Sequence, residues 1–289
     1  MKYEGSIYRP PSEAQSLIIQ ATIGCSHNKC TFCSMYKDKK FRIKEVEEIL
    51  SDIEESKSYY RRVNRVFLAD GNALAMKTAD LKRILFKIRE IMPECERVGI
   101  YSSPKDILRK SEVELRELKE SGLGIAYMGL ESGSDAVLSS INKGVTSSEM
   151  IEAGKKLIAS GIKLSVTLIS GIGGKTGWRE HALESARVIN EIDPQYLGLL
   201  TLLVEPGTEM EQQIKKGEFE LLGPKEVMEE TKLLLENLNL SQGVFRSNHA
   251  SNYFALAGTL PQDKQRLLQE IEQAINSEYD YKDEYFRRL

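Results

Sequence analysis

Short apolar segments alternate with longer segments of helical period, and this alternation constrains the fold more than any other feature of the sequence. Each short segment is rich in β-branched or large apolar residues. Most are almost continuously apolar, which is typical of parallel strands covered on both faces. The six predicted strands are residues 16–24, 64–71, 97–103, 125–131, 163–171 and 196–204. This repetition of strand and helix predicts an α/β fold.

Two of the intervening helices have ends that the sequence marks. Thr146 and Glu149 form a capping box before a helix that should end at Gly161. Ser111 and Glu114 repeat the motif before the helix that leads to the fourth strand. Six strand-and-helix units within about 190 residues favour an open partial (β/α)6 TIM-like barrel over a doubly wound sheet.

The pattern changes in the last third of the chain. Residues 224–240 and 261–275 have apolar side chains at helical spacing, and residues 244–248 predict a short strand. We therefore predict a barrel core followed by a mainly helical C-terminal appendage. The core is expected over residues 1–205 and the appendage over residues 206–289.

The charge balance and the apolar segments argue against two classes of partner. Forty Lys and Arg residues oppose 43 Asp and Glu residues, so the formal net charge is only -3. This balance gives no long-range field toward nucleic acid or an anionic membrane. No segment approaches the roughly 18 apolar residues of a membrane span, and the N-terminus lacks the apolar run of a signal peptide. We expect a cytoplasmic protein without a membrane or nucleic-acid partner.

Three of the four cysteines lie in one short segment, ATIGCSHNKCTFCSMY, after the first predicted strand. In the cytoplasm such clustered thiols indicate metal ligands or catalytic groups, since disulfides are rare there. A structural zinc site usually has four ligands, but His27 lies within the loop and Cys95 precedes the third strand. A 4Fe-4S cluster held by Cys25, Cys30 and Cys33 would leave one iron open to an outside ligand. The three cysteines therefore predict a cluster at the carboxyl ends of the strands, where catalytic groups gather.

With these features the chain resembles the radical S-adenosylmethionine superfamily, in the branch of oxygen-independent coproporphyrinogen III oxidase and the elongator catalytic subunit. The resemblance covers roughly residues 16 to 208. It implies that S-adenosyl-L-methionine binds the open iron through its amino and carboxylate groups, and that one electron cleaves its sulfonium bond. The resulting 5′-deoxyadenosyl radical would abstract hydrogen from a small-molecule substrate. Reduced flavodoxin or a ferredoxin-type protein would supply the electron.

The cysteine spacing departs from the family pattern by one residue. The usual spacing is C-x-x-x-C-x-x-C, whereas this chain has four residues between Cys25 and Cys30. A loop can absorb the extra residue. Phe32, directly before Cys33, matches the aromatic position that lies against adenine in the family.

Further motifs follow the predicted strands. Asp70, Gly71 and Asn72 occupy the place of the family's glycine-rich motif, in which Asp70 or Asn72 could accept the methionine amino group. The alternative is a turn, because D-G and G-N pairs favour turns. Glu131 matches the family glutamate that faces the ribose or the amino acid end of the cofactor. Glu131 could equally be a solvent-exposed residue at the end of a strand.

The fifth and third strands supply the remaining candidates. Gly171 and Gly173, in SGIGGKTG, match a family glycine motif that lets the backbone approach adenine, and the segment does not fit a Walker phosphate loop. Ser102 and Ser165 could point into the barrel and contact the cofactor. Buried hydroxyls that bond to neighbouring backbone are the commoner arrangement.

The C-terminal segment FRSNHASNYF gathers polar and aromatic residues, including Arg246 and His249. Such a cluster could line a substrate pocket, although Ser and Asn also favour capped turns.

Two alternative functions stay open at this point. One is a non-catalytic iron–sulfur or zinc-binding protein, and the other is an RNA-modifying radical S-adenosylmethionine enzyme. After three cysteines bind one cluster, Cys95 alone cannot hold a second, which argues against sulfur-inserting enzymes.

Overall fold

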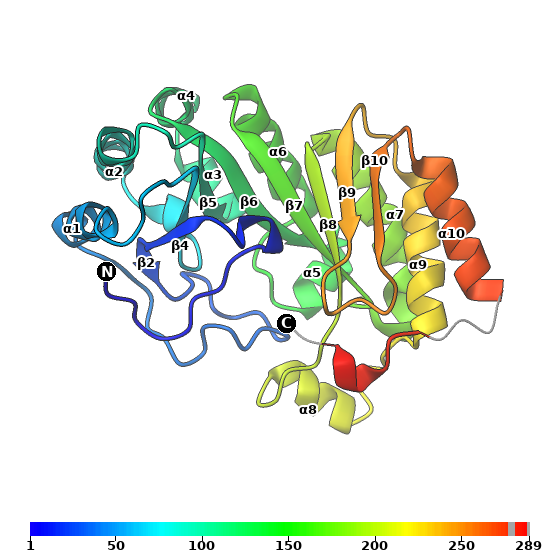
Figure 1. Ribbon diagram of the computed structural model, residues 1–289. Helices are drawn as coiled ribbons and strands as arrows, with labels where there is room; N and C mark the ends of the chain where they lie inside the picture. Colours follow the sequence, from blue (N-terminus) through cyan, green and yellow to red (C-terminus); the bar gives the residue numbers. More distant parts are fainter. Residues whose placement is uncertain (277–280, 288–289) are drawn as a thin grey trace. The chain divides into compact units, whose positions relative to one another are not determined.

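The computed structural model describes residues 1–276 and 281–287 (Figure 1). Its main sheet has eight strands in the order β1-β4-β5-β6-β7-β8-β9-β10. Among the described strands, β1 and β10 stand at opposite edges of this order, so the sheet is open. The bounds are β1 (Leu17–Gln20), β4 (Arg65–Ala69), β5 (Arg97–Ser102), β6 (Leu123–Glu131), β7 (Lys163–Ser170), β8 (Tyr196–Thr201), β9 (Gly243–Ser247) and β10 (Leu256–Leu260).

The strand pairings confirm the predicted open α/β fold. Strands β1, β4, β5 and β6 pair in parallel, as do β7, β8 and β9, and only β10 is antiparallel to its neighbour β9. All six predicted strands are present, but residues 16–24 divide into β1 and β2 (Thr22–Ile23). Strand β2 pairs with β3 (Arg42–Ile43) in a small separate sheet.

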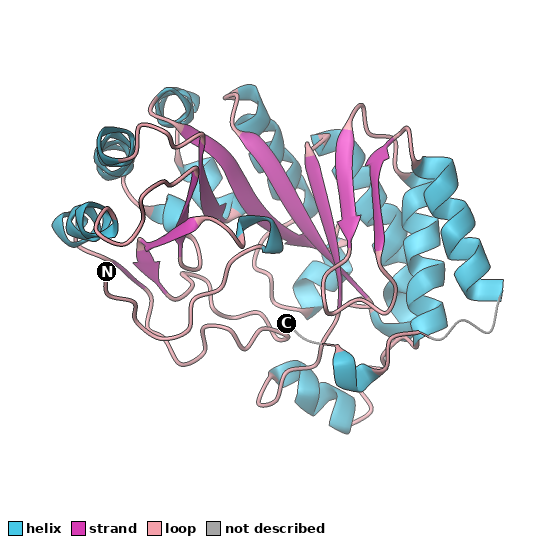
Figure 2. Cartoon of the chain, viewed as in Figure 1, coloured by secondary structure: helices cyan, strands magenta, loops and turns pink. Residues whose placement is uncertain are grey.

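Helices occupy most of the connections between strands (Figure 2). The α-helices are α1 (Val46–Ser56), α2 (Thr78–Ile91), α3 (Pro104–Arg109), α4 (Glu112–Glu120), α5 (Asp135–Ser140), α6 (Ser147–Ala159), α7 (Gly174–Ile192), α8 (Glu209–Lys215), α9 (Pro224–Asn237) and α10 (Lys264–Asn276). Short 3-10 helices are η1 (Pro11–Glu13), η2 (Ala73–Ala75) and η3 (Glu284–Phe286). None of the described helices combines the length and the apolar character that crossing a membrane requires.

The predicted helix caps are confirmed. Ser111 Oγ accepts a hydrogen bond from the Glu114 N–H, and the Glu114 carboxylate accepts one from the Ser111 N–H. Thr146 and Glu149 form the same reciprocal pair, and Gly161 has a φ of +80°. These local interactions end and begin helices where the sequence indicates.

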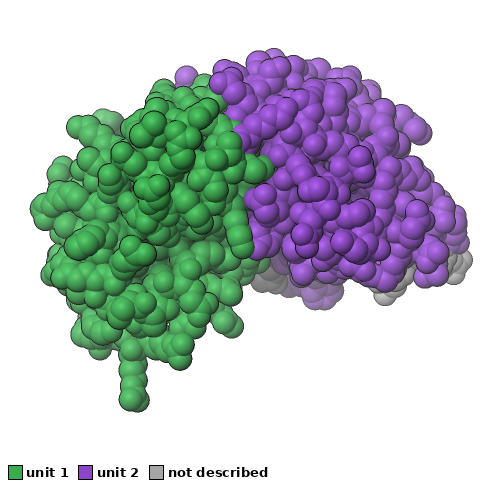
Figure 3. Space-filling view, turned by 90° about the horizontal axis from the view of Figure 1, so that it is seen from above, with its two compact units in different colours: residues 1–28, 35–128, 156–164 green, residues 29–34, 129–155, 165–289 purple. Residues whose placement is uncertain are grey.

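The chain is divided into two compact units (Figure 3). Unit 1 contains residues 1–28, 35–128 and 156–164. Unit 2 contains residues 29–34 and 129–155 and the chain from 165 onward. The boundary that we predicted after residue 205 stays a prediction. In the predicted appendage, α9, α10 and β9 match the expected elements, while β10 was not predicted.

In unit 1 one face of the sheet is aromatic. Phe67 of β4, Tyr101 of β5 and Tyr127 of β6 pack edge to face, with ring centroids 4.9 to 6.4 Å apart. The buried carboxylate of Glu13, in η1, accepts hydrogen bonds from Arg97 and Tyr127. Burial and the bond to Glu13 raise the pKa of Tyr127 well above its usual value. The phenol therefore stays protonated and fixes η1 against β6.

In unit 2 the two faces of the sheet differ. Val166 and Leu168 of β7 are buried, as are Leu197 and Leu199 of β8, while the alternate residues of both strands are half-buried. The continuous apolar sequence predicted that both faces of these strands would be buried. This prediction is wrong for β7 and β8, in which only one face is fully buried. Helices α7, α9 and α10 lie against one face (Figure 1), so the half-buried residues form the other. Such alternation is what a sheet covered on one side requires.

Candidate active site

Cys25 follows β2 in unit 1, and both of its neighbours are tied to the loop after β4. The Gly24 N–H donates to Asp70 Oδ2 at 3.4 Å, and the Ser26 N–H donates to Asn72 Oδ1 at 3.0 Å. Two of the predicted site residues thus hold the loop that carries the first cysteine. The Cys25 side chain is half-buried, and none of the four cysteines forms a disulfide.

Gly71 allows the two loops to touch. A Cβ atom built at this residue would lie 2.0 Å from the Gly24 carbonyl oxygen, far inside van der Waals contact. Its φ of +21° is also one that other residues rarely adopt. A glycine is therefore required here by space as well as by backbone conformation.

Asp70 is buried and carries its own counter-ion. Lys39 Nζ lies 3.0 Å from Asp70 Oδ2, and the two side chains are 6% and 0% exposed. The Tyr36 hydroxyl accepts the Gly71 N–H at 3.2 Å. Burial, and then the Asp70 carboxylate, raise the pKa of Tyr36 far above its usual value. A ligand ammonium group that bonded to Asp70 would share the carboxylate with Lys39.

Asn72 is fully engaged in a buried network. Its Nδ2 donates to Ser26 Oγ and to Asp106 Oδ2, each at 2.6 Å. Asp106 is 2% exposed and also accepts from the Ser103 hydroxyl. The amide is thus oriented by α3, which fixes its oxygen toward the cysteine loop.

The other two cysteines lie in unit 2, on either side of a segment that two helices hold. The Thr31 N–H donates to the Ile141 carbonyl at the end of α5, and the Met210 N–H of α8 donates to the Thr31 carbonyl, each at 3.0 Å. The Cys33 N–H donates to the Cys30 carbonyl at 3.4 Å. Both thiols are half-buried.

Phe32 packs in an apolar cluster of unit 2. The buried members of the cluster are Val137, Ile141, Ile172, Leu202 and Met210. Because Ile172 stands between the predicted residues Gly171 and Gly173, one cluster joins Phe32 to the glycine loop after β7. Gly171 has a φ of +82°, and a Cβ atom at Gly173 would lie 3.0 Å from the backbone of Gly177.

A buried glutamate that the sequence did not indicate holds this glycine loop. Glu230 of α9 is 2% exposed, and its Oε2 accepts the Gly171 N–H at 2.7 Å and the Ser170 hydroxyl. Among the described residues, its Oε1 has no hydrogen-bond partner. Burial raises the pKa of Glu230 to about 7.

Glu131, at the end of β6, is paired with Lys143. Its Oε1 lies 2.8 Å from Lys143 Nζ, and the two side chains are 13% and 15% exposed. Glu131 has a φ of +61°, which is uncommon for a residue other than glycine. A Cβ atom at Gly129 would lie 2.2 Å from the same carboxylate oxygen, so the side chain folds back over its own strand. Residues held in such conformations cluster at functional sites.

Ser102 and Ser165 differ in their surroundings. Ser102 is buried, and its hydroxyl donates to the Tyr127 carbonyl at 3.1 Å. This is the commoner arrangement named above, in which a buried hydroxyl bonds to neighbouring backbone. Ser165 is half-buried on the face of β7 away from the helices. A role in cofactor binding stays a prediction for both.

Within either unit, the described residues bring no three His, Cys, Asp or Glu side chains together around a single-ion site.

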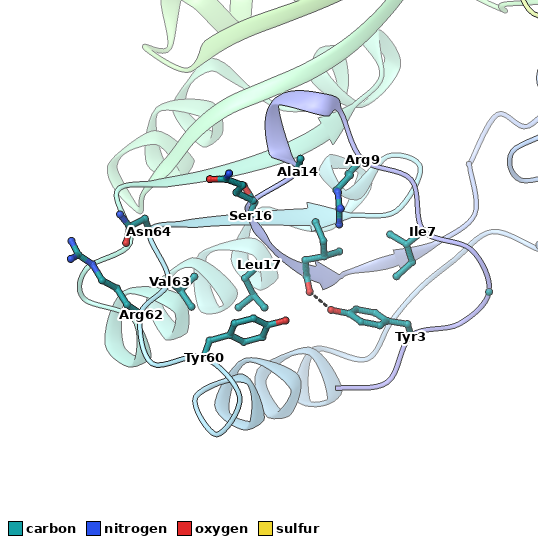
Figure 4. Close-up of a pocket in the computed structure, with 13 residues that line it drawn as sticks. Tyr3, Ile7, Arg9, Ala14, Ser16, Leu17, Tyr60, Arg62, Val63 and Asn64 are labelled. Carbon is teal, nitrogen blue, oxygen red and sulfur yellow. Dashed lines mark hydrogen bonds between the residues drawn. The ribbon is translucent and has the colours of Figure 1, made fainter. Parts of the chain in front are cut away.

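Unit 1 also has a pocket of about 620 Å³ at the amino ends of β1 and β4 (Figure 4). Tyr3 and Tyr60 face each other across it, Arg9 extends toward β1, and the Tyr3 hydroxyl donates to the Ile18 carbonyl at 2.8 Å. The pocket contains none of the predicted site residues.

The model of the Radical SAM superfamily matches residues 19–186. This is more than half of the chain, which therefore belongs to the radical S-adenosylmethionine superfamily. Enzymes of this superfamily cleave S-adenosyl-L-methionine by a radical mechanism with a 4Fe-4S cluster, and they need a reductant and a substrate.

The chain is also similar to individual proteins. The chain is 25% identical over 251 residues to the uncharacterized protein MJ0486 of Methanocaldococcus jannaschii, covering 82% of this chain and 74% of that one. Coproporphyrinogen III oxidase (HemN) from Escherichia coli has a TM-score of 0.58 at 18% identity, covering 76% of this chain and 52% of HemN. Methylornithine synthase (PylB) has a TM-score of 0.56 at 14% identity, with 93% and 74% covered. At these identities the two structures show a shared fold.

Substituting Gly71 by alanine tests the contact between the two loops. Gly71→Ala should displace Gly24 and cost about 1–3 kcal/mol of unfolding free energy, because the site has no room for a methyl group. Alkylation of Cys25 in cluster-free protein, read by peptide mass spectrometry, should become several-fold faster. Gly177→Ala is the matched control: apart from its chain neighbours and the backbone of its own helix, no atom lies within 4 Å of a Cβ at this residue, and alanine in α7 should be neutral or stabilising. Unchanged Cys25 reactivity in Gly71→Ala would contradict the contact.

Glu230→Gln tests the titration of the buried carboxyl. Its folded-state pKa of about 7 exceeds the unfolded value of about 4.3, so the native state holds a proton that the unfolded state has lost. This carboxyl therefore destabilises the wild-type protein increasingly as pH rises from about 5 to about 8. The unfolding free energy of the variant minus that of wild type should grow by about 1–3 kcal/mol across this window. Urea unfolding at several pH values measures it, and a constant difference would refute the raised pKa.

Proposed function

We propose that the protein is a radical S-adenosylmethionine enzyme in which Cys25, Cys30 and Cys33 hold a 4Fe-4S cluster with one iron open to S-adenosyl-L-methionine. The substrate is a small molecule from which the 5′-deoxyadenosyl radical abstracts hydrogen. The observation that carries the proposal is that the cysteine segment is fixed on both sides, by Asp70 and Asn72 around Cys25 and by backbone bonds of Thr31.

The donor set fits such a cluster. Three half-buried thiols without disulfides can act as thiolate ligands, and iron–sulfur clusters are held by cysteine. When bound, the reduced cluster supplies the electron that cleaves the sulfonium bond. A reduced flavodoxin or ferredoxin-type protein is the proposed source of that electron.

The surrounding residues would bind and orient the cofactor. Asp70, with Asn72 orienting the loop, would accept the methionine ammonium group, a charge-assisted bond in a buried place. Glu131 would accept hydrogen bonds from the ribose hydroxyls or the amino acid end. Lys143 Nζ lies 2.8 Å from Glu131 Oε1 and would share that carboxylate with the cofactor.

The adenine would lie between an aromatic side chain and open backbone. Phe32 would supply the aromatic ring, and Gly171 and Gly173 have no side chains that would keep the base from the backbone of the loop after β7. The apolar cluster behind them excludes water from one side of the nucleotide. Ser102 and Ser165 are the proposed additional contacts.

The reconstituted protein should form 5′-deoxyadenosine from S-adenosyl-L-methionine when reduced anaerobically with dithionite. Cys30→Ala should abolish the product, because a cluster ligand is lost, while Cys95→Ala should retain it. Cys95 precedes β5, where its thiol donates to the Arg97 carbonyl. Chromatography of the nucleoside measures the outcome. An intact cluster in the wild-type protein with no 5′-deoxyadenosine would overturn the proposed function.

A further inference from the structure

The face of the unit 2 sheet that lies away from the helices has an ordered arrangement of side chains. Strands β7, β8 and β9 are parallel, so residues paired in register share a face. Strand β10 extends this face, with Ala257 paired to Arg246 and Thr259 paired to Val244. The rows on this face are Ser165, Tyr196 and Val244; Thr167, Gly198 and Arg246; and Ile169 with Leu200.

Arg246 is the one charged residue that the strands contribute to this face. No other residue of β8, β9, β10 or the unit 2 part of β7 carries a charge, and all of these residues are described. Arg246 and its partner Ala257 are exposed, while Gly198 and Thr167 in the same row are half-buried. After β10, Arg266 pairs with Asp263 and donates to the Ala257 carbonyl, and the Asp263 carboxylate interacts electrostatically with Arg246.

One nitrogen of the Arg246 guanidinium, Nη1, is hydrogen-bonded to backbone carbonyl groups. Nη1 donates to the Phe245 carbonyl at 2.8 Å and to the Gly258 carbonyl at 3.2 Å. Because the guanidinium is planar, anchoring Nη1 leaves Nε and Nη2 as a second pair of parallel donors. This pair has the geometry that binds both oxygens of a carboxylate.

The position of Arg246 relates it to a predicted cofactor contact. Through Gly198, Arg246 is in register with Thr167 of β7, and Ser165 belongs to the adjacent row of the same face. The loop after β9 is also fixed, since Asn252 Nδ2 donates to the Leu199 carbonyl at 2.9 Å.

We propose that Arg246 binds a carboxylate group of the enzyme's substrate. This inference rests on the proposed function, because it assigns the substrate class to the sheet face that carries Ser165, a proposed cofactor contact. The Nε and Nη2 pair matches the two oxygens of one carboxylate group, and the nearby groups that could bond to those oxygens are the hydroxyls of Thr167, Ser165 and Thr259.

Protection of Arg246 from phenylglyoxal tests the site directly. In holoprotein with cluster and S-adenosyl-L-methionine, malonate should slow the labelling of Arg246 about tenfold or more at saturation, measured by peptide mass spectrometry. Arg109, whose side chain is 76% exposed, is the internal reference and should label at an unchanged rate. Malonamide and chloride at matched ionic strength should not protect. No protection by malonate, or equal protection by inorganic phosphate, would overturn the proposal.

Calorimetric titration with malonate supplies the second readout. Arg246→Gln should weaken malonate binding about 10- to 100-fold, because the charge-assisted pair is lost, while Arg246→Lys should recover part of it. Arg109→Gln is the matched control and should bind like wild type, and circular dichroism verifies the fold of each variant. Equal binding by Arg246→Gln and wild type would overturn the inference. Malonate binding does not require cleavage of S-adenosyl-L-methionine, so it can fail or succeed independently of 5′-deoxyadenosine formation.

Discussion

Hydrogen bonds between two loops at the ends of neighbouring strands are the interactions on which the candidate site depends. Asp70 and Asn72 accept the backbone N–H groups on both sides of Cys25, and Gly71 leaves space for this close approach. Buried bonds of this kind are costly to leave unmade. The position of the first cysteine is therefore determined by the end of β4 rather than by residues 24–41 themselves, which form no helix or strand.

Charge balance is a second constraint that both units share. The two carboxylates that the family resemblance assigns to the cofactor each have a lysine partner, Lys39 for Asp70 and Lys143 for Glu131. Charges removed from water need such a partner. Glu230 differs, because it is buried without a cation and its pKa is raised to about 7. A ligand that bonds to Asp70 or Glu131 would share the carboxylate with a lysine.

The features that could be predicted from the sequence are those that depend on residues close together in the chain. The strands and the capping boxes at Ser111 and Thr146 depend on residues near one another in the chain, and so does the cysteine segment. Lys39 and Glu230 contact Asp70 and Gly171 from 31 and 59 residues away, and no local pattern marks either one. Strand β10, with the sequence LAGTL, is short and has a central glycine, so only its pairing with β9 defines it. Long-range pairing and charge balance were therefore the parts that the sequence left open.

The central claim is that three cysteines hold a cluster whose remaining iron takes S-adenosyl-L-methionine through its amino group. Electron–nuclear double resonance on the reduced protein, with ¹⁵N in that amino group, measures this most directly. We expect a hyperfine coupling between the cluster spin and the ¹⁵N nucleus, which Cys25→Ala should remove. An intact, reduced cluster that shows no coupling in the presence of saturating labelled S-adenosyl-L-methionine would contradict it.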